Sequence, residues 1–126
     1  MNEYDYQAER IVEAYHNAIR MIEIKEDNAR EQYLRQKESL DTMRQVLVSL
    51  DTETYTTLDG SSELCQEGQD ILQRTAFIIN NADDEVESDY RELCRKLEYD
   101  REEAHDIYSK SLRYLDEQAG GYHYGF

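Results

Sequence analysis

The feature that most constrains this chain is the absence of proline from all 126 residues. Proline and glycine are the strongest local interruptions of helical structure, so a chain without proline can continue as helix over long stretches. Of the five glycines, only Gly68 falls within a helical pattern, because the others lie in the polar run of residues 51–62 or in the last seven residues. This distribution predicts two long helices separated by one polar turn.

Apolar residues recur at alternating steps of three and four along both halves of the chain, which places them on one face of a helix. In each half the heptad pattern is interrupted once by an insertion of four residues, and such a stutter relaxes left-handed supercoiling. We call the row of residues that each helix is expected to turn toward the other its seam. The expected seam of the first helix is Tyr4, Ala8, Ile11, Tyr15, Ala18, Ile22, Glu26, Ala29, Tyr33, Gln36, Leu40, Met43, Leu47 and Leu50. The expected seam of the second helix is Leu72, Thr75, Ile79, Ala82, Val86, Tyr90, Leu93, Leu97, Ala104, Tyr108, Leu112 and Leu115.

The fold class that follows is all-α, an antiparallel hairpin of two long, coiled-coil-like helices. We expect helices over residues about 3–50 and about 62–118, joined by a turn over about 51–61. Residues 1–119 would form the hairpin. Two consecutive glycines are expected to end the second helix, which leaves residues 120–126 as a flexible tail.

The middle of the expected seam is polar, so two helices make an incomplete core. Glu26 and Gln36 would meet the neighbourhood of Asn80, Asn81 and Asp83, where burial leaves polar groups short of partners. Two helices have no third surface to close this gap, and a single seam is a marginal core. We therefore expect the hairpin to complete a bundle of three or four helices, with another protein or as a homodimer.

Aromatic and aliphatic residues beside this polar middle are candidates for the partner-binding surface, because such side chains are enriched in interface cores. The alternative, that Phe77 and Ile78 widen the hairpin's own seam, stays open at this point. The candidates are Tyr33, Phe77, Ile78 and Tyr90.

The charge of the chain argues against nucleic acid as a partner, since 29 acidic residues outnumber 14 basic ones and the net charge is −15. No stretch approaches the roughly 20 apolar residues of a membrane span. The first residues are acidic where a secretory signal would be basic and then apolar. We expect a cytoplasmic protein, and export together with a partner, by a route that needs no signal peptide, stays open.

Two Glu-x-x-His motifs, Glu13 to His16 and Glu102 to His105, have the ligand spacing of carboxylate-bridged di-iron bundles. The seam passes through Tyr15, so both histidines are expected to point sideways or outward, whereas metal ligands in such bundles face the interior. We therefore predict no metal site. No phosphate-binding loop, nucleophile elbow or other catalytic signature accompanies these motifs, so we predict no enzymatic activity and no cofactor.

The two cysteines, Cys65 and Cys94, lie 29 residues apart on the same expected helix. That spacing corresponds to about 43 Å along a helix axis, far beyond the reach of a disulfide. Both fall close to apolar positions, so we expect them to be small core residues.

Two short motifs accompany the hairpin pattern: Leu58-Asp59-Gly60 in the expected turn, and Tyr99-Asp-Arg-Glu-Glu103 in the second helix. With them, this acidic two-helix hairpin resembles the WXG100-related proteins of type VII secretion, especially the small α-helical accessory proteins encoded beside LXG toxins. That family has Trp-x-Gly in its turn and a Tyr-x-x-x-Asp/Glu export signal, which Tyr99 and Glu103 match.

This resemblance implies a non-enzymatic targeting factor or chaperone. Its partner would be the helical N-terminal domain of an LXG toxin, or another small helical accessory protein. The alternative from a different class is a cytosolic coiled-coil homo-oligomer of structural or phage-related function.

Overall fold

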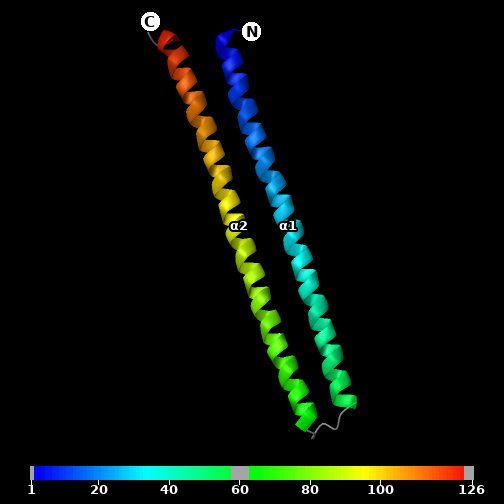
Figure 1. The fold of residues 1–126 in the computed structure, drawn as a ribbon. Coiled ribbons are helices and arrows are strands. Elements are labelled where there is room, and N and C mark those ends of the chain that lie inside the picture. Colours follow the sequence, from blue (N-terminus) through cyan, green and yellow to red (C-terminus); the bar gives the residue numbers. More distant parts are fainter. Residues whose placement is uncertain (1, 58–62, 124–126) are drawn as a thin grey trace. The chain divides into compact units, whose positions relative to one another are not determined.

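The structure, a computed structural model, describes residues 2–57 and 63–123 and consists of two helices (Figure 1). Helix α1 covers Glu3–Thr57 and helix α2 covers Glu63–His123. The two helices pack against each other in opposite directions, and no strand occurs in the described residues. The predicted all-α hairpin is therefore confirmed.

The hairpin divides into two compact units, each built from facing stretches of α1 and α2. The terminal unit comprises Met1–Asn28 and Leu93–Phe126, and the turn unit comprises Ala29–Glu92. Each unit has its own buried residues at the helix interface. These are Ile22, Leu97 and Leu115 in the terminal unit, and Ala29, Leu40, Cys65 and Ile79 in the turn unit.

Helix α1 is longer than the sequence predicted. It continues to Thr57, so the predicted end near residue 50 is wrong and residues 51–57 of the predicted turn are helical. The rest of that turn, residues 58–61, lies outside the described residues. Thr52 shows why a polar run does not end the helix, because its hydroxyl donates to the carbonyl oxygen of Val48 at 3.0 Å. A threonine whose hydroxyl bonds within the helix does not need a turn to satisfy it.

Helix α2 also continues further, to His123, so the predicted break at Gly120 and Gly121 is wrong. Glycine costs only about 1 kcal/mol relative to alanine inside a helix, which is too little to end a long one by itself. No described glycine adopts a positive φ. The remainder of the expected flexible tail, residues 124–126, lies outside the described residues.

The seam of α1 follows a different order of three- and four-residue steps from the one predicted. A second slip, from Tyr33 to Lys37, brings Lys37 and Arg44 to the helix interface in place of Gln36 and Met43. Repeated slips approach an 11-residue period of about 3.67 residues per turn, close to the 3.6 of a straight helix. The residues wrongly assigned to the seams, which are exposed, are Gln36, Met43, Leu50 and Leu93. Tyr4 lies at the edge of the interface, where its hydroxyl donates to Asp116 of α2.

Gly68 lies where α1 and α2 of the turn unit approach each other closely. A Cβ atom added at Gly68 would sit 3.1 Å from Cγ2 of Thr54, which is a tight contact. The glycine within the helical pattern is thus explained by the approach of the facing helix.

We predict that Gly68→Leu destabilises the hairpin by about 1–3 kcal/mol, because its side chain must push Thr54 and α1 away. Gly68→Ala is the matched control, since its single methyl requires only a small shift and gains helix propensity. Urea unfolding followed by circular dichroism measures both changes. Equal stability of the two variants would contradict the close approach.

Candidate protein-binding surface

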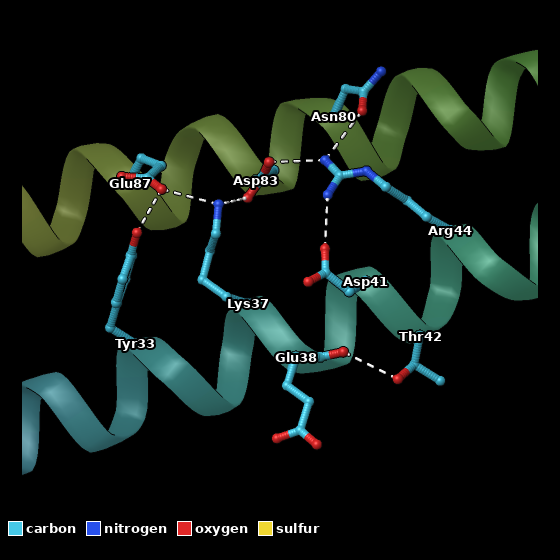
Figure 2. Close-up of polar contacts among 9 residues, drawn as sticks. All are labelled: Tyr33, Lys37, Glu38, Asp41, Thr42, Arg44, Asn80, Asp83 and Glu87. Atoms are coloured by element: carbon cyan, nitrogen blue, oxygen red, sulfur yellow. Dashed lines mark hydrogen bonds and ion pairs between the residues drawn. The ribbon is translucent and has the colours of Figure 1, made fainter.

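A polar network joins the two helices along the seam of the turn unit (Figure 2). Lys37 Nζ donates to Asp83 Oδ1 at 2.6 Å and lies 2.9 Å from Glu87 Oε1. Arg44 Nη2 donates to Asp83 Oδ2 at 2.8 Å, and the Tyr33 hydroxyl donates to Glu87 Oε1 at 2.5 Å. Cations of α1 therefore face carboxylates of α2 at half-buried positions.

The hydrogen bonds and ion pairs of this network provide partners for the polar side chains of the seam. Among the described residues, no buried side-chain nitrogen or oxygen atom lacks a hydrogen-bond partner, so the prediction of unpaired polar groups is wrong. Arg44 Nη2 also donates to Asn80 Oδ1 at 3.2 Å. In the terminal unit, Glu26 pairs with Arg101. The reason is that Lys37, and not its neighbour Gln36, lies in the seam and supplies the charge that pairs with the carboxylates of α2.

The same contacts shift the protonation of the network. Hydrogen bonds from Lys37 and then Arg44 lower the pKa of Asp83. Hydrogen bonds from Tyr33 and then Lys37 lower the pKa of Glu87. In turn, the hydrogen bonds to Asp83 and Glu87 raise the pKa of Lys37. All three groups are therefore held in their charged forms at neutral pH.

We predict that the stabilising effect of Asp83 disappears in acid. A carboxylate whose pKa is lowered by folding stabilises the folded state above its unfolded pKa, here 3.8, and loses this effect as the pH falls through the folded pKa. The difference in Tm between the wild type and Asp83→Asn should be greatest near pH 7 and shrink below about pH 4.

The matched control for this experiment is Asp84→Asn, which removes the same charge from an exposed neighbour. Both variants change the net charge by the same amount, so a difference between their Tm values reports the loss of the contacts that Asp83 makes in the network. A Tm difference between wild type and Asp83→Asn that is constant from pH 7 to pH 3 would contradict the assignment.

The four predicted partner-binding residues divide into two kinds. The rings of Tyr33 and Tyr90 stack on each other, with centroids 4.2 Å apart, and both residues are half-buried between the helices of the turn unit. They belong to the hairpin's own interface. Phe77 and Ile78 are 66% and 64% exposed, so they are not packed in the hairpin's own seam. They line a shallow depression on α2 together with Asp70, Gln73 and Arg74.

The terminal unit has an apolar groove between its helices, with a volume of about 520 Å³. Met21 and Ile107, which immediately precede the seam residues Ile22 and Tyr108, line it and are exposed. The groove thus adds a second apolar row beside the seam. Its other apolar lining residues are Ile11, Ala14, Tyr15, Ala18, Ile22, Ala104 and Tyr108.

The turn unit repeats this arrangement with exposed aliphatic residues on both helices. Met43 and Val46 immediately precede seam positions of α1, as Ile71 and Ile78 do on α2. In antiparallel helices, the residues that precede the seam lie on the same side of the pair, as the lining of the groove in the terminal unit shows. An apolar stripe widened in this way is typical of helices in larger bundles.

The two motifs behind the family resemblance have different outcomes. Tyr99 is 64% exposed and Glu103, one turn later on α2, is also exposed, so the possible export motif is displayed on the helix surface. The predicted turn motif, Leu58 and Gly60, lies outside the described residues.

The Glu-x-x-His motifs lie at the surface of the terminal unit. His16 and His105 are both exposed, and Tyr15 contacts the ring of each, at centroid distances of 6.0 Å and 6.3 Å. Tyr15 itself stacks on Tyr108 at 4.5 Å. Within residues 2–57 and 63–123, no group of three or more His, Cys, Asp or Glu residues is arranged to hold a metal ion.

The cysteines differ from each other in exposure. Cys65 is fully buried, as expected, whereas Cys94 is exposed and is not a core residue. Cys94 lies one residue after Leu93 and three before the buried Leu97, so it falls beside the seam of α2.

No family model, curated protein or solved structure matches this chain. In the described part of the chain, neither helix contains a stretch long and apolar enough to cross a membrane. The surface of the hairpin therefore provides the basis for a functional proposal.

Proposed function

We propose that this protein is a non-enzymatic accessory protein that binds a helical segment of another protein. In the finer form implied by the family resemblance, the partner is the helical N-terminal domain of a type VII-secreted LXG toxin. The hairpin then acts as a targeting factor or chaperone before export.

The observation that carries this proposal is the exposed apolar row beside the seam in each unit, represented by Met21, Ile107, Met43 and Ile78. Removing apolar surface from water is favourable by roughly 25 cal/mol per Å². A layer of two helices can bury such a row only against a further helix or layer. A partner helix supplies that cover.

Phe77 and Ile78 are the strongest candidates for anchors on the turn unit. A phenylalanine offers a large apolar area, and aromatic side chains dominate the energetics of many interfaces. The adjacent Asp70 and Arg74 line the same depression and provide the polar surroundings that such anchors usually have.

We predict that Phe77→Glu and Ile78→Glu each weaken binding of the toxin N-terminal domain by roughly 100-fold, about 3 kcal/mol, because a charge would be buried at the contact. The binding can be measured by titration with the purified N-terminal domain of an LXG toxin. Folding of the free variants should be unchanged, since both side chains are exposed.

Val48→Glu is the matched control. Val48 is also exposed, but it lies on α1 beside Leu47 and does not line the depression that contains Phe77 and Ile78. If Val48→Glu weakens binding as much as the two test variants do, or if the test variants unfold the free protein without changing affinity, the anchor assignment is wrong.

We further predict that Tyr99→Ala abolishes export of the partner while leaving its binding and the Tm unchanged. Glu103→Ala should also abolish export with an unchanged Tm, although Glu103 lines the groove of the terminal unit as well. Both residues are exposed on α2, so they are available to a secretion apparatus without supporting the fold. Secretion into the medium and co-purification from cells report these two effects separately. Normal export by both variants would remove these residues from the proposed function.

A further inference from the structure

The groove of the terminal unit has one basic side and one acidic side. The charged residues that line it from α1 are Arg10 and Lys25, and those that line it from α2 are Asp100 and Glu103. This basic side is unusual in a chain with about two acids for every base. The opposite side of α1 in the same unit is mixed, because its depression is lined by acids as well as by Arg20.

These four charges are available to a partner. None of them takes part in the ion pairs found among the described residues. Arg10 lies 5.8 Å from the centroid of the Tyr6 ring, a contact that leaves its charge uncompensated. Opposite charges on a docked segment would therefore gain ion pairs without breaking existing ones.

We propose that this groove docks a single amphipathic helix of a partner protein and that its oppositely charged sides fix the direction of that helix. The apolar stripe of the helix lies between Met21 and Ile107. Its acidic flank lies over Arg10 and Lys25, and its basic flank lies over the two carboxylates of α2. The inference rests on the proposed function, since it specifies the chemistry of the partner helix.

The direction of the docked helix follows from the geometry of its two flanks. Turning a helix end for end, while keeping its apolar stripe on the groove, exchanges its two flanks. A given arrangement of charges therefore matches the groove in one direction only. In a right-handed helix that runs parallel to α1, the residues immediately after the stripe positions lie over α1, so these are the positions where acids fit.

A second copy of this chain is a less suitable occupant. Each copy carries a net charge of −15, and a large net charge of one sign opposes self-association. A helix with acidic residues on one flank and basic residues on the other can bind in the groove without this electrostatic repulsion.

The test uses designed 21-residue helical peptides as probes. The bipolar peptide has Glu after and Lys before each stripe residue, and the neutral peptide has Gln at both flanks. Each peptide carries an acceptor dye at its N- or C-terminus, and the protein carries a donor on the exposed Cys94. The buried Cys65 is protected from labelling, and the two peptide ends are about 30 Å apart, so energy transfer reports direction.

We expect the bipolar peptide to bind at least tenfold more tightly than the neutral one at low salt. Cys94 lies at the same end of the terminal unit as the last α1 residues of that unit, so the C-terminal dye should show the stronger transfer. Reversing the groove charges with R10E, K25E, D100K and E103K together should move the stronger transfer to the N-terminal dye while affinity stays within about threefold.

Met21→Glu and Ile107→Glu should each reduce peptide affinity at least tenfold, whereas Phe77→Glu in the turn unit should leave it unchanged. Circular dichroism checks that each variant is folded. Equal transfer to both peptide ends, or equal affinity for the bipolar and neutral peptides, would overturn the proposal.

Sedimentation provides the remaining decisive outcome. A wild-type dimer that Met21→Glu converts to a monomer would assign the groove to a second copy and overturn the partner-helix inference. Binding of the toxin domain through Phe77 and Ile78 is measured separately, so a failure of the groove proposal and a failure of the proposed function can be told apart.

Discussion

The constraint on which this structure depends is that two helices share a single interface. Each helix can turn only one face toward the other, so every residue on that face must be either packed or paired. The small buried set, with Leu40 and Ile79 in the turn unit and Leu97 in the terminal unit, reflects this limit. Tyrosine suits such an interface because its ring packs while its hydroxyl reaches the edge of the interface.

Charge in the seam gives the pairing of the helices a specific register. Lys37 and Arg44 are one heptad apart on α1, and both reach Asp83 from opposite directions along the helix. Sliding α2 by one turn would take Asp83 away from one of them and leave a half-buried charge without its partner. Polar residues within a helical interface can fix register in this way, at some cost in stability compared with apolar packing.

Much of the fold was predictable, because it follows from strong local signals. The absence of proline and the three-and-four spacing gave the fold class and the start of α1. The helix ends were missed because threonines and two consecutive glycines weaken a helix without ending it. That Lys37 lies in the seam, and not Gln36, could not be predicted from hydrophobicity, because neither residue is apolar. Only the ion pairs across the interface decide between them.

The candidate surface was predictable only in part. Tyr33 and Tyr90 look like interface residues in sequence, yet they stack on each other, whereas Phe77 and Ile78 remain exposed. A usable signal did exist for the groove. Met21 and Ile107 each come one residue before a seam position, and this wider stripe distinguishes a helix of a larger bundle from one of an isolated pair.

The mixture of heptad steps and four-residue slips has a geometric consequence for any ligand of these helices. A strict heptad drifts in one angular sense around a straight helix, and an 11-residue step drifts in the other. Combined within one unit, the two drifts offset each other, so the residues beside the seam stay in line instead of winding around the helix. A groove of this kind runs straight, so a partner helix can lie along it without supercoiling around the hairpin.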